Sequence, residues 1–150
     1  MVRGNLKGVI CALTVGFLLT VSAAVVFADS YAQSTPYVFT NIYTYENYAA
    51  LNVSGAIQGA LGLGYILTQD GGDVPAGYMD ISAKLYNNAG NIIEAGPYIS
   101  NTDPERELEE GSGYDSTHGY YQGGADTAVY NGSTYTHYWA NETVKLYYPT

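Results

Sequence analysis

The feature that most limits the fold of this chain is a two-residue alternation of side-chain type that recurs after residue 28. Residues 37–45, 78–86 and 127–139 are rich in β-branched and aromatic residues. Period-two alternation places one set of side chains on each face of a strand, whereas a helix repeats every 3.6 residues. The chain is therefore predicted to consist mainly of β-strands. In residues 78–86 the pattern places one set inward (Met79, Ile81, Ala83, Leu85) and the other outward (Asp80, Ser82, Lys84, Tyr86).

Turn residues between these segments predict hairpins. The sequence NNAG at 87–90 separates residues 78–86 from a returning strand at 91–99. Asn131-Gly132 indicates a two-residue type I′ turn, because that turn needs positive φ at both central positions. The strand after this turn is expected to place Tyr135, His137 and Trp139 on one face and Tyr138 on the other.

Two segments leave alternatives open. Residues 51–67 carry four glycines within ten residues, and each glycine costs a helix about 1 kcal/mol relative to alanine. A long bent or bulged strand, or two strands, is therefore expected there. The polar stretch 100–119 is predicted to hold a short helix from Asp103 to Glu110, with Pro104 in its first turn; a solvated connection is the alternative.

Short strands with regular turn signals are typical of one antiparallel β-sandwich, either immunoglobulin-like or a small barrel. The last segment predicts a pair of strands about Asn131-Gly132, with a third strand ending near Tyr148. The predicted fold class is accordingly all-β, in a single domain.

The first 28 residues read as a signal peptide. Arg3 and Lys7 precede an apolar run over residues 9–27, and Ala28 occupies a small-residue cleavage position. A retained transmembrane anchor and a pilin-type leader cut after Gly8 are the alternatives. Cleavage after Ala28 leaves residues 29–150 as a secreted domain without cysteine, because Cys11 is the only one in the chain.

The charge of the predicted mature domain is strongly negative. All 14 acidic residues but only three basic ones (Lys84, Arg106, Lys145) follow residue 28, which gives residues 29–150 a net charge of −11. Such a chain repels phosphate backbones, so nucleic acid is not an expected partner. Contact with a membrane is expected only through an uncleaved leader.

Little in the sequence indicates catalysis. The two histidines, His118 and His137, lie far apart, and no Gly-x-Ser-x-Gly nucleophile motif occurs. We therefore expect no enzymatic activity and no resident cofactor. Calcium is the alternative at two acidic stretches, with the candidate ligands Asp70, Asp73, Asp103 and Glu105.

The aromatic residues allow two interpretations. All 17 tyrosines and the single tryptophan follow residue 28. They can form a core and cross-strand ladders, or they can present rings to a protein or sugar. The candidate ligand-binding residues are Tyr135, His137, Tyr138 and Trp139. Sequons occur at Asn52, Asn131 and Asn141 and would be glycosylated only in a suitable host.

These observations predict a secreted, extracellular domain that acts by surface contact, as an adhesion, matrix or cell-surface component. The expected partner is a protein or glycan at a cell surface, or a second copy of the chain. The alternatives are a carbohydrate-binding module centred on Trp139 and an exported bacteriocin or toxin.

Overall fold

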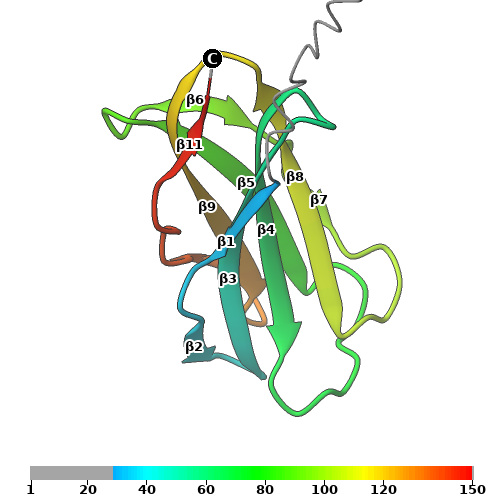
Figure 1. The fold of residues 1–150 in the computed structure, drawn as a ribbon. Coiled ribbons are helices and arrows are strands. Elements are labelled where there is room, and N and C mark those ends of the chain that lie inside the picture. The colour runs from blue at the N-terminus through cyan, green and yellow to red at the C-terminus, as the bar shows by residue number, and fades with distance from the viewer. Residues whose placement is uncertain (1–28, 150) are drawn as a thin grey trace, which may run out of the picture.

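A computed structural model describes residues 29–149, which are all-β (Figure 1). The predicted leader, its cleavage after Ala28 and Cys11 lie outside the described residues. Within them there is no helix long and apolar enough to cross a membrane. The strands are β1 (Ser30–Gln33), β2 (Tyr37–Thr40), β3 (Thr44–Ser54), β4 (Gly59–Thr68), β5 (Met79–Asn87), β6 (Ile92–Ala95), β7 (Ile99–Ser100), β8 (Glu107–Asp115), β9 (Gly119–Tyr130), β10 (Tyr135–Trp139) and β11 (Leu146–Tyr148).

The strands form two antiparallel sheets. The first has the order β1-β3-β4-β8, with β2 also paired to β3. The second has the order β10-β9-β5-β6, with β11 paired to β9 and β7 paired to β5. Each of the long strands β3, β5 and β9 thus pairs along one edge with two short strands, which follow each other along that edge. These short strands are β1 and β2 on β3, β6 and β7 on β5, and β10 and β11 on β9. Both sheets are antiparallel throughout, as the hairpin signals in the sequence predict.

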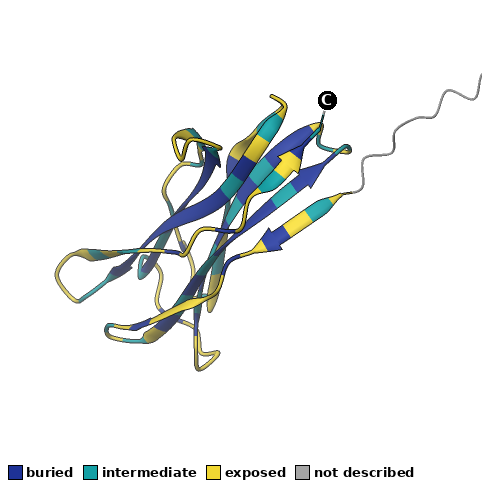
Figure 2. Cartoon of the chain, turned by 60° about the vertical axis from the view of Figure 1, so that its left-hand side comes forward, coloured by how far each residue is buried: buried dark blue, intermediate teal, exposed yellow. Residues whose placement is uncertain are grey.

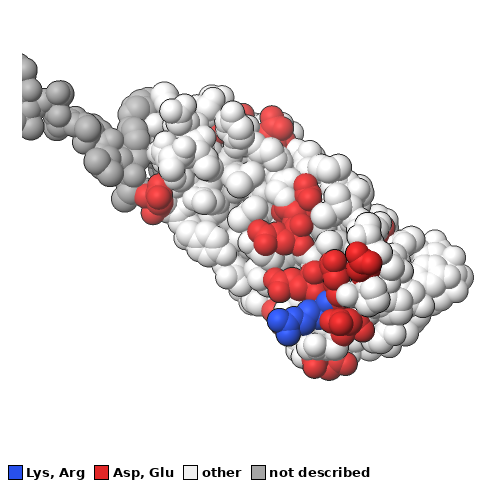
Figure 3. All heavy atoms as spheres, turned by 90° about the vertical axis from the view of Figure 1, so that its right-hand side faces the viewer, with Lys and Arg blue, Asp and Glu red and all other residues white. Residues whose placement is uncertain are grey.

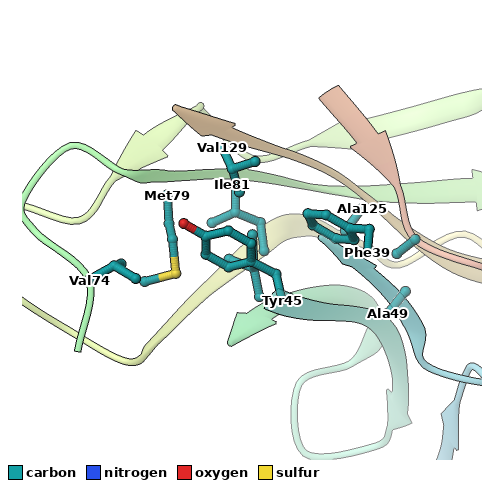
Figure 4. Close-up of a cluster of buried hydrophobic side chains, with 10 residues drawn as sticks. Phe39, Tyr45, Ala49, Val74, Met79, Ile81, Ala125 and Val129 are labelled. Carbon is teal, nitrogen blue, oxygen red and sulfur yellow. The ribbon is translucent and has the colours of Figure 1, made fainter. Parts of the chain in front are cut away.

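The inner faces of the two sheets enclose the hydrophobic core, and Figure 2 shows the alternation of buried and exposed residues along the strands. The predicted inward set of β5 (Met79, Ile81, Ala83, Leu85) is fully buried, as expected. Of the predicted outward set, Ser82, Lys84 and Tyr86 are buried as well, so burial does not alternate along this central strand. One cluster contains Phe39, Tyr45 and residues of β4, β5 and β9. Figure 4 shows the Tyr45 ring lying among these side chains. A second cluster forms around Leu51, Leu85 and Tyr121.

Three glycines allow the two sheets to approach at the level of their backbones. A Cβ atom added to Gly62 of β4 would lie 2.4 Å from the carbonyl oxygen of Lys84 in β5. One added to Gly123 of β9 would lie 2.3 Å from the carbonyl oxygen of Ala50 in β3, and one added to Gly64 would lie 2.7 Å from a side-chain carbon. Sheets that pack through side chains lie about 10 Å apart. We call Gly62, Gly64 and Gly123 the glycine seam.

A buried amide links the sheets on one side of this seam. Asn47 of β3 is fully buried, and its Nδ2 donates to Thr127 Oγ1 at 2.7 Å and to the carbonyl oxygen of Tyr138 at 3.1 Å. Thr127 Oγ1 also donates to that carbonyl at 2.8 Å. Because both acceptors belong to the second sheet, Asn47 fixes the position of one sheet relative to the other.

Two segments differ from their predicted extent. The predicted strand over residues 37–45 is broken at residues 41–43, and β2 and β3 form a hairpin in which Phe39 pairs with Tyr45. Residues 51–67 form two strands, one of the expected alternatives, with a turn at 55–58 between β3 and β4. Odd-numbered residues such as Leu51 and Val53 face inward before this turn, and even-numbered residues face inward after it. Leu61, Leu63 and Leu67 therefore lie half-buried on the outer face of the first sheet.

The predicted helix from Asp103 to Glu110 is wrong. Residues 107–115 form β8, which pairs with β4 along the edge of the first sheet. The segment before it is held extended, because Val74 pairs with Glu105 and the amide of Thr68 donates to the carbonyl of Arg106 at 2.9 Å. Strand pairing therefore outweighs the helix propensity of the glutamates.

The hairpin at Asn131 is confirmed, but its turn is not the predicted two-residue type. Tyr130 pairs with Tyr135, which leaves a four-residue loop between β9 and β10. Gly132 has positive φ, whereas Asn131 does not. The side-chain oxygen of Asn131 instead accepts the amides of Ser133 and Thr134 at 3.1 and 3.0 Å, which closes the loop as an Asx-type turn.

We expect Gly62→Ala to destabilise the domain by about 3 kcal/mol or more, because its Cβ would overlap the backbone of the facing sheet. Gly111→Ala is the matched control, since a Cβ there meets its nearest atom, Leu61 Cδ1, at an ordinary 3.7 Å. Urea unfolding measures both. Equal stabilities for the two variants would contradict close approach at the seam.

Alkaline pH should unfold the domain through its buried tyrosines. Burial raises the pKa of Tyr45 from 10.0 to about 12, and burial with a hydrogen bond to Asp115 raises that of Tyr121 to about 12. Because the folded pKa lies above the unfolded value, the stabilisation is fully present below pH 10 and is lost as pH rises through about 12.

Thermal melting across this range tests the expectation. Tyr45→Phe should keep or raise stability at neutral pH, since the Tyr45 hydroxyl has no hydrogen-bond partner among the described residues, and should reduce the alkaline loss. Tyr37→Phe, at an exposed tyrosine, is the control. An identical alkaline profile for Tyr45→Phe and the unmodified chain would refute this assignment.

Candidate functional site

Strand β10 presents three of the predicted site residues on the outer face of the second sheet. Tyr135, His137 and Trp139 alternate along the strand, and Trp139 is 57% exposed. Tyr98, from the connection between β6 and β7, joins them, because its ring meets that of His137 edge-on with the centroids 6.0 Å apart. We call Tyr98, Tyr135, His137 and Trp139 the Trp139 face.

Asp126 lies at the centre of this face. It is buried, and it occupies the outward position of β9 opposite Trp139. One carboxylate oxygen lies 3.1 Å from His137 Nδ1, and the other accepts the hydroxyl of Tyr98. An ionised carboxylate only accepts hydrogen bonds, so the proton of His137 resides on Nδ1. Asp126 therefore sets the orientation of both rings.

A buried lysine lies beside Asp126 on the same sheet face. Lys84 Nζ donates to Ser82 Oγ at 2.6 Å and lies 5.3 Å from the centre of the Tyr98 ring. Ser82 Oγ in turn donates to the carbonyl oxygen of Gly96 at 2.7 Å. The outward residues of β5 are thus covered by the Gly96–Tyr98 segment, and the lysine is compensated by a hydroxyl and a π-face.

Tyr135 closes the other end of the face. Its hydroxyl donates to the carbonyl oxygen of Gly77 at 2.6 Å, and its ring contacts that of Tyr130. Burial, with smaller contributions from Asp80 and Tyr130, raises the pKa of Tyr135. The phenol therefore stays protonated at neutral pH and keeps this hydrogen bond.

The remaining predicted site residue, Tyr138, does not belong to this face. Its ring stacks on Phe39 with the centroids 3.8 Å apart and packs against the first core cluster. This agrees with the alternation of the strand, which places Tyr138 opposite its neighbours. Tyr138 contributes to stability and is not available to a ligand on the Trp139 face.

The calcium candidates do not converge. Asp70 and Asp73 share the loop before Val74, and the pairing of Val74 with Glu105 brings that loop alongside residues 103–105. Asp70 Oδ1 accepts the amide of its own loop residue Gly72 at 3.1 Å. Within the described residues, no group of three or more acidic, histidine or cysteine side chains is placed to hold an ion.

Acidic residues gather on the side of the molecule formed by β8, where Figure 3 shows a single basic group among them. Glu107 and Glu109 are exposed on β8, and Glu109 accepts the hydroxyl of Tyr65 at 2.9 Å. Over residues 29–149, the one contact of ion-pair geometry joins His137 and Asp126, and it is an ion pair only when His137 is protonated. The carboxylates of the acidic side therefore have no ion-pair partner among the described residues.

Sequence reasoning missed Asp126, Lys84 and Tyr98. Alternation placed Lys84 outward but gave no reason to connect it with Tyr98, which lies 14 residues away across a loop. The sequence did contain one indication of Asp126, because it is the one acidic residue within β9 and it alternates with the inward-facing residues of that strand.

Comparison with protein-family models, curated proteins and solved structures finds no match to this chain.

We expect Asp126→Asn to destabilise the domain by about 2–3 kcal/mol, because both carboxylate oxygens accept hydrogen bonds in a buried position. Asp103→Asn, at an exposed carboxylate in a loop, should change stability by no more than about 0.5 kcal/mol. Chemical denaturation measures both. A buried role for Asp126 is ruled out if the two substitutions have equal effects.

Proposed function

We propose that the chain is a secreted, non-enzymatic domain with an immunoglobulin-like β-sandwich that acts by surface contact, as an adhesion, matrix or cell-surface component. The two antiparallel sheets with a core between their inner faces support the sandwich. The leader-like residues 1–28 support export. The Trp139 face is the proposed contact surface.

The observation that carries this proposal is the exposure of Trp139 on an ordered strand. Tryptophan is the residue most enriched where binding energy concentrates, because a large rigid ring buries much area at little cost in conformational entropy. Here the only tryptophan of the chain is 57% exposed, while Tyr138 beside it fills the core. Folding alone does not require an exposed indole at this position.

The bonding of the polar groups supports a binding role over a catalytic one. Ser82 is fully buried, donates to a backbone carbonyl and accepts from Lys84, so its hydroxyl is neither exposed nor free to attack a substrate. Asp126 is occupied by His137 and Tyr98. These groups hold the aromatic rings in place.

A glycan is the second candidate partner, favoured by the polar groups beside the indole. Sugars pack their C–H faces on aromatic rings and need hydrogen-bonding groups at the edge of the ring. His137 supplies such a group, because its side chain is 54% exposed and only Nδ1 is engaged by Asp126. Self-association through this face is opposed by the net charge of −11 on residues 29–150.

Trp139→Ala should lower binding of the purified, labelled chain to intact cells of its source organism by at least about tenfold, because an interface tryptophan contributes about 2 kcal/mol or more. Tyr31→Ala, at a tyrosine of β1 that is 59% exposed, should bind within about twofold of the unmodified chain. The same proteins applied to a glycan array and to immobilised cell-surface protein distinguish the two partner classes.

Trp139→Phe separates a loss of the ring from a loss of structure, since it keeps an aromatic surface and should retain part of the binding. Circular dichroism verifies that each variant is folded. Undiminished cell binding by folded Trp139→Ala would exclude the Trp139 face as the contact surface.

A further inference from the structure

A hollow of about 440 Å³ opens at the end of the domain where the β5–β6 and β8–β9 turns meet. In Figure 1 this end lies at the top, close to β6, β11 and the C-terminus. Its volume falls within the range of small-molecule sites, about 300–1,000 Å³. Tyr121 of β9 lines the hollow and lies five residues along the strand from Asp126, roughly 17 Å away. The hollow is therefore separate from the Trp139 face.

The floor of the hollow is a rigid part of the core. Ile93 and Tyr121 line it, and both belong to or pack against the second core cluster. Tyr121 is only 3% exposed, and its hydroxyl is held by Asp115 Oδ1 at 3.0 Å and by the carbonyl of Thr117. At the rim, the ring of Tyr120 packs against that of Tyr147 with the centroids 4.9 Å apart, and the rest of this half-exposed side chain is available to a ligand.

Asp115 supplies a hydrogen-bond acceptor. Its Oδ1 accepts the hydroxyl of Tyr121 and the amide of Thr117, and the side chain of Thr117 also hydrogen-bonds the carboxylate. A carboxylate has about four acceptor sites, so these three contacts leave room for a further donor. Burial alone would raise the pKa of Asp115, but the hydrogen bonds from Thr117 and Tyr121 outweigh it and hold the pKa below its ordinary value. The carboxylate is thus ionised at neutral pH and oriented, and it can accept a further hydrogen bond.

Two asparagines of the β5–β6 turn, which also lines the hollow, supply donors. Asn87 Oδ1 accepts the amides of Ala89 and Asn91 at 3.0 and 3.1 Å, which leaves its NH₂ group unused by these contacts. Asn88 is held by Lys145 Nζ, which donates to its backbone and side-chain oxygens at 2.9 and 3.1 Å. The lysine thus fixes the loop and leaves the second NH₂ group as a donor.

We propose that this hollow binds a single uncharged sugar unit. Each sugar hydroxyl both donates and accepts, so it can pair with the Asp115 carboxylate of the β8–β9 side and with the amide donors of the β5–β6 turn. The C–H face of a pyranose packs against an apolar floor and an aromatic rim, as Ile93 and Tyr120 provide. The Asp115 carboxylate disfavours an anion, and the ammonium of Lys145 is already engaged by the two oxygens of Asn88. A cation would meet the amide donors and only one carboxylate.

Titration of the ¹⁵N-labelled chain with glucose, galactose, mannose and N-acetylglucosamine tests this site by NMR. We expect at least one sugar to shift the amides of residues 87–93 and 115–121 saturably and to leave the indole N–H of Trp139 unmoved. Tyr120→Ala and Asp115→Asn should each weaken this binding at least tenfold. Tyr31→Ala, at an exposed tyrosine of the other sheet, should leave it unchanged.

The two substitutions guard against a structural explanation. Asp115 also holds the turn at Thr117, whereas the exposed ring of Tyr120 can be removed without opening the core. The proposal fails if none of the sugars gives saturable shifts, if inorganic phosphate or choline shifts these residues and sugars do not, or if sugars move Trp139 alone. The last result would instead support a glycan at the Trp139 face, so the two proposals are separable.

Discussion

The structure depends on backbone-to-backbone contact between the two sheets at the glycine seam. At Gly62 and Gly123 there is no space for even a methyl group, because a carbonyl oxygen of the facing sheet occupies it. Side chains cannot fill the interior at this level, so the core divides into one cluster around Tyr45 and another around Leu51. With no cysteine after residue 28, the domain is stabilised by this packing and by the hydrogen bonds of Asn47.

The seam also connects the core to the two surfaces proposed to bind ligands. The carbonyl oxygen of Lys84 faces Gly62, while its side chain reaches the outer face and contacts Ser82 and Tyr98. The backbone that determines the sheet spacing therefore also positions part of the Trp139 face. The second core cluster, beyond the seam, supports the floor of the hollow beside Asp115. The floor of the hollow and most of the Trp139 face are formed by paired strands, which favours recognition with little loss of entropy.

The sequence predicted the strands and side-chain orientations that depend on two-residue alternation. It did not predict the contacts between segments that are distant along the chain. Strand β5, its hairpin and the orientation of Tyr135, His137 and Trp139 follow from period-two patterning, because a strand places successive side chains on opposite faces. The glycines of β4 were seen as a cost to a helix, but their role as sites of close approach needs the facing sheet. The strand at 107–115 was missed because pairing with β4, a tertiary contact, decides its conformation. The hydrogen-bond partners of Asp126 come from β10 and from a loop, and no local sequence pattern predicts a contact between these separate segments.

Close approach of the sheets can be measured directly through nuclear Overhauser effects across the seam. We expect strong cross-peaks between the α-protons of Gly62 and the backbone protons of residues 84 and 85. Equally strong cross-peaks should join the α-protons of Gly123 to the backbone protons of residues 50 and 51. Absence of these cross-peaks in a folded, well-dispersed spectrum would show that the sheets lie at ordinary spacing. It would thereby contradict the packing on which the core and both surfaces depend.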